Sequence, residues 1–133
     1  MNCDNKICGC IGEILNKILL LQKNNSYDDC FVGCDKPFLG PSPSVFTYNT
    51  RPITLFNRYT GEPWSFTYTS GTTTAVSSIL RVECLDDCCC TCRILGVGEV
   101  EGTYTNTGEF VTIDLNSVGA IRCFADTFVD GIA

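Results

Sequence analysis

The sequence predicts an all-β domain: an antiparallel two-sheet sandwich of jelly-roll type with about eight strands, preceded by one N-terminal amphipathic helix. Three observations lead to this fold class. The 133 residues suffice for the core of one domain. Apolar residues near the N-terminus recur at helical spacing. From residue 44 onward, short segments rich in Val, Ile, Thr and aromatic residues alternate with turn residues.

The chain therefore divides into three segments within a single domain overall. Residues 1–25 form a cysteine-bearing arm and the helix, residues 26–43 a Cys- and Pro-rich connector, and residues 44–133 the β-sandwich. In the connector, Pro37, Pro41 and Pro43 cannot donate to a sheet ladder, so regular strand pairing is not expected there.

The helix is predicted from Ile7 to Gln22. Glu13, Asn16 and Lys17 lie largely on the side opposite the apolar stripe, and Asn24-Asn25-Ser26 predicts the end of the helix. The stripe consists of Ile7, Ile11, Ile14, Leu15, Ile18, Leu19 and Leu21.

The strands are predicted from alternating polarity and from the turn residues between them. In the segment from Phe110 to Leu115, odd-numbered positions are apolar and positions 112 and 114 are polar, as in a strand with one buried face. Turns are predicted at residues 59–63, 70–71 and 106–108. The predicted strands are Val45–Tyr48, Ile53–Asn57, Trp64–Thr69, Ala75–Leu85, Cys90–Val97, Gly102–Asn106, Glu109–Leu115 and Ala120–Phe124.

Composition excludes several classes of function. A net charge of -6 with scattered basic residues argues against a nucleic-acid partner. Because the chain has no histidine, the commonest general base and mixed Cys/His zinc sites are absent, and we expect no enzyme and no cofactor. No segment is apolar and long enough to predict a membrane span or a secretory signal, so synthesis in the cytosol is expected.

The cysteine content is the feature of the composition that indicates a function. There are 11 cysteines, an odd number, so at least one thiol cannot pair within a monomer if the others oxidise. Such a count in a cytosolic product is best explained by oxidation after release from the cell. The residues predicted to form disulfides or cross-links are Cys3, Cys8, Cys10, Cys30, Cys34, Cys84, Cys88, Cys89, Cys90 and Cys123.

Geometry restricts how the cluster at residues 84–92 can bond. On an extended strand, Cys88, Cys90 and Cys92 share one face at spacings of roughly 6.6 Å, with parallel Cβ directions that disfavour bridging. Their partners must therefore lie elsewhere. An extended arm of residues 1–9 reaches on the order of 30 Å, so Cys3, Cys8 and Cys10 are the best placed thiols for reaching a neighbouring subunit.

Other interpretations stay open beside this one. A thiolate metal-binding module is possible in principle, although no CxxC spacing occurs. A redox enzyme would be expected to carry the same CxxC motif, which the sequence lacks. Cys92 and Cys123 also suit a reduced, buried core. Trp64 and its neighbouring aromatic residues suit core packing better than a ligand cage.

Three groups of residues resemble the CotY/CotZ/ExsY-type family of cysteine-rich spore outer-coat, crust and exosporium proteins. The first is Cys8-Gly9-Cys10 leading into a helix, followed by Cys30 and Cys34. The second is Leu80 to Glu83 leading through Leu85 and Asp87 to Cys88-Cys89 and Ile94-Leu95. The third is Ile113 to Leu115 followed by Ala120 to Cys123.

The resemblance implies a structural protein that assembles with itself, as a ring or a hexagonal lattice, and with other spore-coat or exosporium proteins, hardened by disulfides. It implies synthesis in the mother cell and deposition on the spore surface; a subunit or anchor of a spore-surface fibre is the alternative role. Family members often carry cysteine where this chain has Asp86, Ser117 and Gly119, so their bonding scheme does not transfer.

Overall fold

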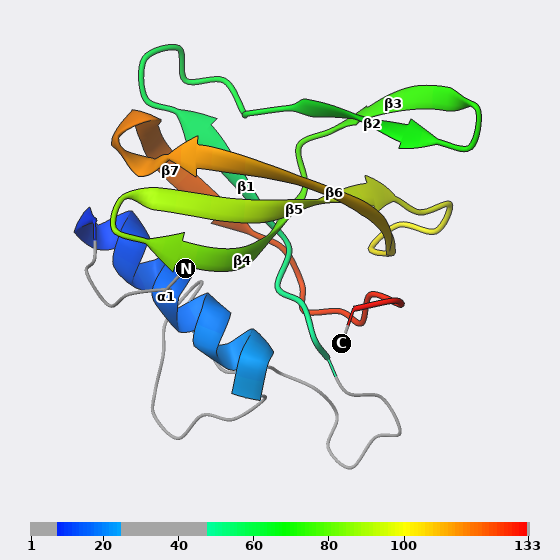
Figure 1. The fold of residues 1–133 in the computed structure, drawn as a ribbon, viewed down its shortest axis with the longest axis horizontal. Helices are drawn as coiled ribbons and strands as arrows, with labels where there is room; N and C mark the ends of the chain where they lie inside the picture. Colours follow the sequence, from blue (N-terminus) through cyan, green and yellow to red (C-terminus); the bar gives the residue numbers. More distant parts are fainter. Residues whose placement is uncertain (1–7, 25–47, 133) are drawn as a thin grey trace.

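The computed structural model describes residues 8–24 and 48–132 of the chain (Figure 1). The connector at 26–43, most of the strand predicted at 45–48, and Cys3, Cys30 and Cys34 lie outside the described residues. In chain order the elements are α1 (Gly9–Asn24), β1 (Ile53–Asn57), β2 (Phe66–Ser70), β3 (Thr73–Ser77), β4 (Leu80–Asp86), β5 (Cys89–Val97), β6 (Tyr104–Asp114), the short 3-10 helix η2 (Leu115–Ser117) and β7 (Val118–Cys123).

The predicted N-terminal helix is confirmed, displaced by two residues toward the C-terminus. Its apolar stripe buries Leu15, Ile18 and Leu19 against the sheet, where α1 packs on β4 and β7 (Figure 1). Gln22 fastens the last turn, because its amide donates to the carbonyl of Val82 at 2.9 Å and accepts from the backbone of Arg51 at 3.1 Å. The helix is therefore fixed by packing along its length and by hydrogen bonds at its end.

The strands form one five-stranded antiparallel sheet, in the order β6-β5-β4-β1-β7, and a separate β2-β3 hairpin. The mostly β prediction is confirmed. The jelly-roll sandwich is not, because five of the seven strands in the described residues pair into one sheet and the other two form a hairpin. Hydrogen-bonded pairing between strands distant in sequence decided this, and short alternating segments do not encode it.

The sheet is strongly coiled. β6 and β7 are its two edges, yet the chain passes from Asp114 to Val118 through the three residues of η2. Four peptide units span at most about 14 Å, whereas the edges of a flat five-stranded sheet lie roughly 19 Å apart. Coiling therefore brings the end of β6 and the start of β7 together, at the same end as the β4-β5 turn (Figure 1).

Two strand predictions differ from the structure in an informative way. The single strand predicted at 75–85 is divided between β3 and β4, because Ser77 donates to the carbonyl of Leu95 at 2.6 Å and accepts from the backbone of Ile79 at 3.0 Å, which ends the hairpin. Conversely, the turn predicted at 106–108 is a bulge inside the continuous strand β6. The turns at 59–63 and 70–71 are confirmed.

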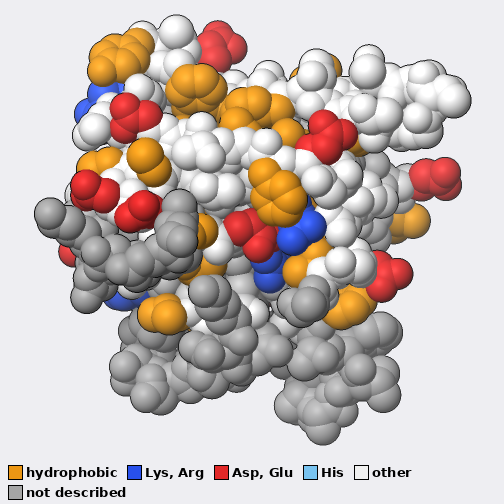
Figure 2. Space-filling view, viewed as in Figure 1, with side chains coloured by type: hydrophobic (Ala, Val, Ile, Leu, Met, Phe, Trp, Pro, Cys, Tyr) orange, Lys and Arg blue, Asp and Glu red, His pale blue; other side chains and the backbone are white. Residues whose placement is uncertain are grey.

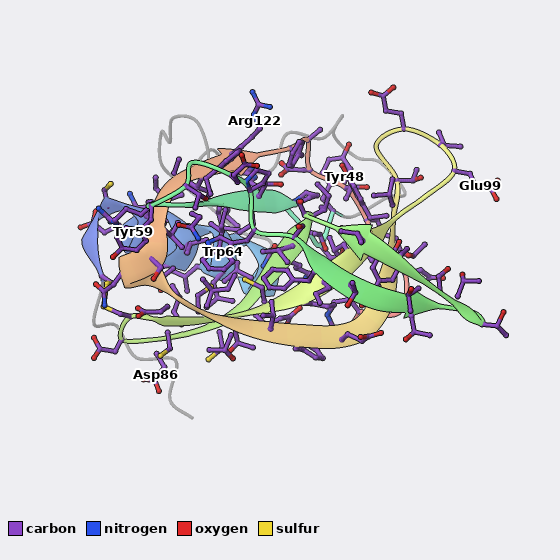
Figure 3. The ribbon with its side chains drawn as sticks, turned by 90° about the horizontal axis from the view of Figure 1, so that it is seen from above. Tyr48, Tyr59, Trp64, Asp86, Glu99 and Arg122 are labelled. Carbon is purple, nitrogen blue, oxygen red and sulfur yellow. A yellow bond between two sulfur atoms is a disulfide. The ribbon has the colours of Figure 1, made fainter. Side chains whose placement is uncertain are left out.

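The core lies between α1 and the sheet, with the β2-β3 side closed by aromatic residues. Trp64, Phe66 and Tyr68 pack against the core cluster, and the Trp64 and Phe66 rings stack with centroids 6.4 Å apart. Seen from above, Trp64 lies within the molecule, whereas Asp86 and Glu99 mark opposite ends of it (Figure 3). The prediction that these aromatics serve core packing is confirmed. Among residues 8–24 and 48–132, no helix is long and apolar enough to cross a bilayer.

Candidate functional site: the cysteines

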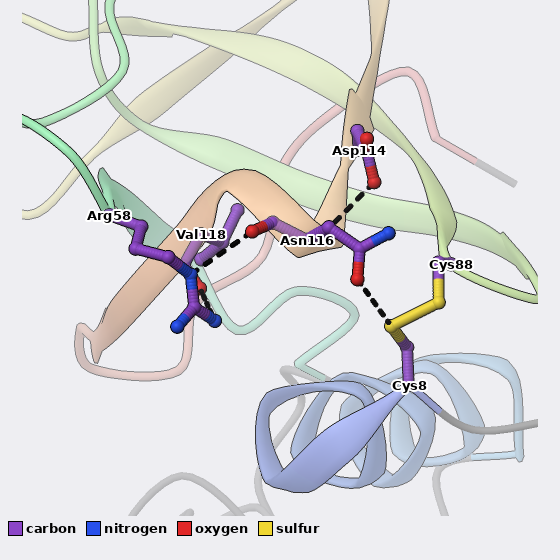
Figure 4. Close-up of a disulfide and its surroundings, with 6 residues drawn as sticks. All are labelled: Cys8, Arg58, Cys88, Asp114, Asn116 and Val118. Atoms are coloured by element: carbon purple, nitrogen blue, oxygen red, sulfur yellow. Dashed lines mark hydrogen bonds between the residues drawn. A yellow bond between two sulfur atoms is a disulfide. The ribbon is translucent and has the colours of Figure 1, made fainter.

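One disulfide joins the start of the helix to the sheet. Cys8, immediately before α1, bonds Cys88 in the β4-β5 turn across 80 residues of sequence, with an S–S distance of 2.19 Å and Cα atoms 5.2 Å apart (Figure 4). The expectation that Cys88 pairs outside its own cluster is confirmed. Cys8 was predicted to belong to an arm reaching a neighbour, but in the structure it binds within its own chain.

The 3-10 helix η2 holds this disulfide from the side of β6. The backbone of Leu115 donates to the carbonyl of Cys88 at 2.8 Å. The side-chain oxygen of Asn116 lies 3.8 Å from the sulfur of Cys8, and the backbone of Asn116 donates to Asp114 at 3.0 Å (Figure 4). A sulfur in a disulfide carries no hydrogen, so the Asn116 contact becomes a hydrogen bond only when Cys8 is a thiol.

The cysteines of β5 alternate between the surface and the core. Cys89 is an exposed free thiol, whereas Cys90 and Cys92 are free thiols with no exposed surface. Their sulfurs lie 3.4 Å apart and share a hydrogen bond, not a disulfide. The expectation that Cys90 and Cys92 share a face is confirmed, as is the interpretation of Cys92 as a small buried residue. Cys88 lies in the turn before the strand and does not share that face.

Burial and neighbours suppress ionisation of the inner pair. The pKa of Cys92 is raised well above the usual value for a thiol, first by its hydrogen bond with Cys90, then by burial and by the nearby charges of Cys90 and Glu83. A thiol must ionise to act as a nucleophile, so Cys92 is chemically quiet in the folded protein.

The remaining described cysteines occupy the surface or are bonded. Cys10, in the first turn of α1, is an exposed free thiol. Cys84 and Cys123 are both disulfide-bonded, so the reduced-core interpretation fails for Cys123. A bond from Cys10 to another subunit stays a prediction.

Carboxylates surround the exposed thiol of β5. Cys89 is in register with Asp86 of β4 and Asp114 of β6, so the three side chains stand in a row across the sheet. Asp87 follows in the turn with φ of 61°. Acidic side chains are visible at this end of the molecule in Figure 2. Within the part of the chain that the structure describes, no group of three or more Cys, Asp or Glu residues is arranged to hold a metal ion.

The cysteines of this site were predicted from the sequence, whereas Asn116 was not. Its position beside the disulfide depends on the coiling that joins β6 to β7, and a lone Asn between two strand segments gives only a turn signal. The pairing of Cys8 with Cys88 likewise depends on where α1 packs.

Comparison with known proteins supplies the family. No curated protein and no solved structure matches this chain. A family model described as spore coat protein Z matches residues 1–103, most of the chain, from the N-terminal cysteines through α1 and β5 to the end of the β5-β6 loop. The matched segment contains both halves of the Cys8–Cys88 disulfide and both exposed thiols. The chain therefore belongs to the spore coat protein Z family.

Proposed function

We propose that this chain is a structural subunit that assembles with copies of itself into a layer of the spore surface, in the exosporium, outer coat or crust, where disulfides between subunits then fix the layer. Membership in a spore coat family implies a place at the spore surface and a class of proteins that is not generally enzymatic. The partners are further copies, in a ring or hexagonal lattice, and other proteins of the same coat.

One observation carries the proposal. Two exposed free thiols, Cys10 and Cys89, each lie within two residues of a formed disulfide at one end of the molecule. Exposed thiols that are unpaired on a folded surface can bond a neighbour that is held in place. The remaining free thiols that the structure describes are buried.

The mechanism is alignment followed by covalent trapping. Non-covalent contacts first place the subunits, and a disulfide closed between two aligned chains then costs little additional entropy, because the relative position is already fixed. Oxidation is expected late, since a reducing mother-cell cytosol keeps thiols free until the layer meets an oxidising environment.

Electron microscopy and non-reducing gels of the purified chain test this function. Wild-type protein is expected to form ordered assemblies that resist dissociation until reductant and heat are combined. Cys10→Ser and Cys89→Ser together should leave assemblies that dissociate on heating without reductant. Cys92→Ala is the matched control, because it removes a buried thiol and leaves both exposed thiols in place.

The result separates the outcomes clearly. A wild-type protein that remains monomeric on a non-reducing gel after oxidation, and that gives no assemblies on the grid, contradicts the proposal. Filaments in place of layers would favour the role of fibre subunit or anchor.

A further inference from the structure

The Cys8–Cys88 disulfide can accept attack by a thiol, and the free thiols of Cys10 and Cys89 lie next to it in the sequence. Within one chain, however, the fold directs these two thiols away from the disulfide. Cys10 lies two residues after Cys8, in the first turn of α1, whereas Cys8 precedes the helix. Cys8 faces the sheet through its bond to Cys88, whereas Cys10 is exposed. Cys89 directly follows Cys88, but adjacent residues at the start of a strand project to opposite sides. Neither Cys10 nor Cys89 of the same chain is therefore directed at this disulfide, and attack by either thiol comes from another molecule.

Resting on the function proposed above, we propose that the Cys8–Cys88 disulfide accepts attack by Cys10 of a second copy, so that subunits become cross-linked by exchange without an oxidant. The Cys10 thiolate of one chain attacks the sulfur of Cys88 in the other. The Cys10–Cys88 bond forms between chains, the Cys8–Cys88 bond breaks, and Cys8 leaves as a thiolate that takes a proton from water. One thiol is consumed and one is released, so the number of disulfides and the number of thiols are unchanged.

Charge selects Cys10 over Cys89 as the attacking thiol. Cys89 stands between Asp86 and Asp114, and the acceptor Cys88 follows Asp86 and Asp87 in the chain. An attack by Cys89 would place its flanking carboxylates directly against those that precede Cys88 in the other chain, and like charges in close contact disfavour the encounter. The first turn of α1, where Cys10 lies, contains no acidic residue.

Asn116 selects Cys8 as the leaving group. Its amide oxygen, 3.8 Å from the Cys8 sulfur, can accept the S–H of the released thiol, and rotation of the amide would instead direct its N–H₂ to the thiolate. The released Cys8 is therefore stabilised in either protonation state. Asn116 is therefore a positioning residue, because it acts on the exchange through the leaving sulfur of Cys8. The freed Cys8 also gives the attacked subunit a new thiol with which cross-linking can continue.

The test begins with full-length monomer isolated at pH 5, where few thiols are ionised and exchange is slow. The protein is then moved to pH 8 in the absence of oxygen and with a chelator present. Covalent dimers and larger species should appear on a non-reducing gel, with an unchanged number of free thiols per chain. Peptide mapping should find Cys10 bonded to Cys88 of another chain and a free Cys8.

Variants assign the roles. Cys10→Ser should abolish anaerobic cross-linking, and Asn116→Ala should slow it about five-fold, the effect of one lost hydrogen bond, without changing the melting temperature of the monomer. Asn116→Gln, which restores an amide, should recover part of the rate. Cys92→Ala should cross-link at the wild-type rate, because that thiol is buried.

Three results would overturn the inference: a loss of two thiols for each new bond, a Cys10–Cys8 linkage in the map, or unchanged anaerobic cross-linking in a Cys8→Ser/Cys88→Ser variant. Cross-links that form only after an oxidant is added would remove the exchange mechanism and leave the proposed function standing. The absence of covalent oligomers with and without oxidant would remove both.

Discussion

Cys89 and Cys90 are neighbours in the sequence, but only the thiol of Cys89 is available for cross-linking. Successive side chains of β5 point to opposite faces, so the sulfur of Cys89 meets solvent while that of Cys90 lies in the core beside Cys92. A thiol's availability for cross-linking is thus decided by strand parity, one residue at a time. A single-residue slip of β5 would exchange the buried and exposed sets.

The buried thiols of Cys90 and Cys92 make the folded protein less stable at alkaline pH. The pKa of Cys92 is raised in the folded protein, by its hydrogen bond with Cys90 and by burial, above the usual thiol value of 9.0. Above that pH the unfolded chain loses a proton that the folded chain keeps, so the free energy of unfolding falls as pH rises. One such group contributes a slope of at most about 1.4 kcal/mol per pH unit.

We therefore expect the Cys92 thiol to leave the free energy of unfolding in urea unchanged between pH 6 and 8 and to lower it above about pH 9. The pKa of Tyr104, raised by burial and then by Glu101, adds a decline in the same direction above its usual value of 10.0. Cys92→Ala should reduce the slope between pH 8.5 and 10. An equal slope in that variant would show that the buried thiol does not cause the decline.

At the scale of elements, β6 remains continuous because it absorbs a bulge. Between the pairs Arg93 with Phe110 and Leu95 with Asn106, the single residue Ile94 faces three residues of β6. Thr107 donates to the carbonyl of Ile94 at 2.6 Å, and the backbone of Gly108 donates to the side chain of Asn106 at 3.0 Å. Gly108 has a φ of +76°, in the left-handed region that favours glycine.

Gly108→Ala tests whether the bulge depends on that backbone conformation. An added Cβ would meet no atom within 4 Å, so the cost is conformational and should lower the free energy of unfolding by about 1–2 kcal/mol. Gly108→Asn should cost less, because Asn tolerates the left-handed region. Both are measured by urea unfolding of the reduced and oxidised protein. Equal losses for Ala and Asn would point to a cause other than φ.

The elements themselves were largely predictable, and their arrangement was not. β1 was predicted residue for residue, and α1 within two residues, because local periodicity and turn chemistry carry that information. The residues at 106–108 have the composition of a turn, and tertiary pairing with β5 makes them a bulge instead. The pairing of five strands into one coiled sheet depends on contacts between distant strands, which the alternation of each strand leaves open.

Across the whole molecule, non-local bonds fasten the start and end of α1 to the sheet. Cys8 bonds Cys88 before the helix begins, and Gln22 bonds the backbones of Val82 and Arg51 near its end. The buried ion pair of Arg51 with Asp126, at 2.6 Å, fastens the segment after β7 to the same region. The cysteines of the candidate site were readable from the sequence, but their pairing and exposure required this docking.

The balance between charge and apolar surface governs how copies meet. Each chain carries a net charge of -6, which repels other copies, while several large apolar side chains remain about half exposed or more. These are Leu20, Tyr59, Val76, Val97, Val100, Phe110 and Phe128. If apolar contacts hold the subunits together, screening should favour assembly, since the Debye length falls from about 30 Å at 0.01 M salt to about 8 Å at 0.15 M.

Light scattering of the Cys10→Ser/Cys89→Ser variant measures this step without cross-linking by the exposed thiols. Non-covalent assembly is expected to be faster and more extensive at 0.15 M sodium chloride than at 0.01 M, at the same pH and protein concentration. Sucrose at matched osmolality is the control, because it adds solute without screening charge. If salt instead dissolved the assemblies, the interface would have to pair opposite charges, and the scattered basic residues of this acidic chain would have to supply the positive side.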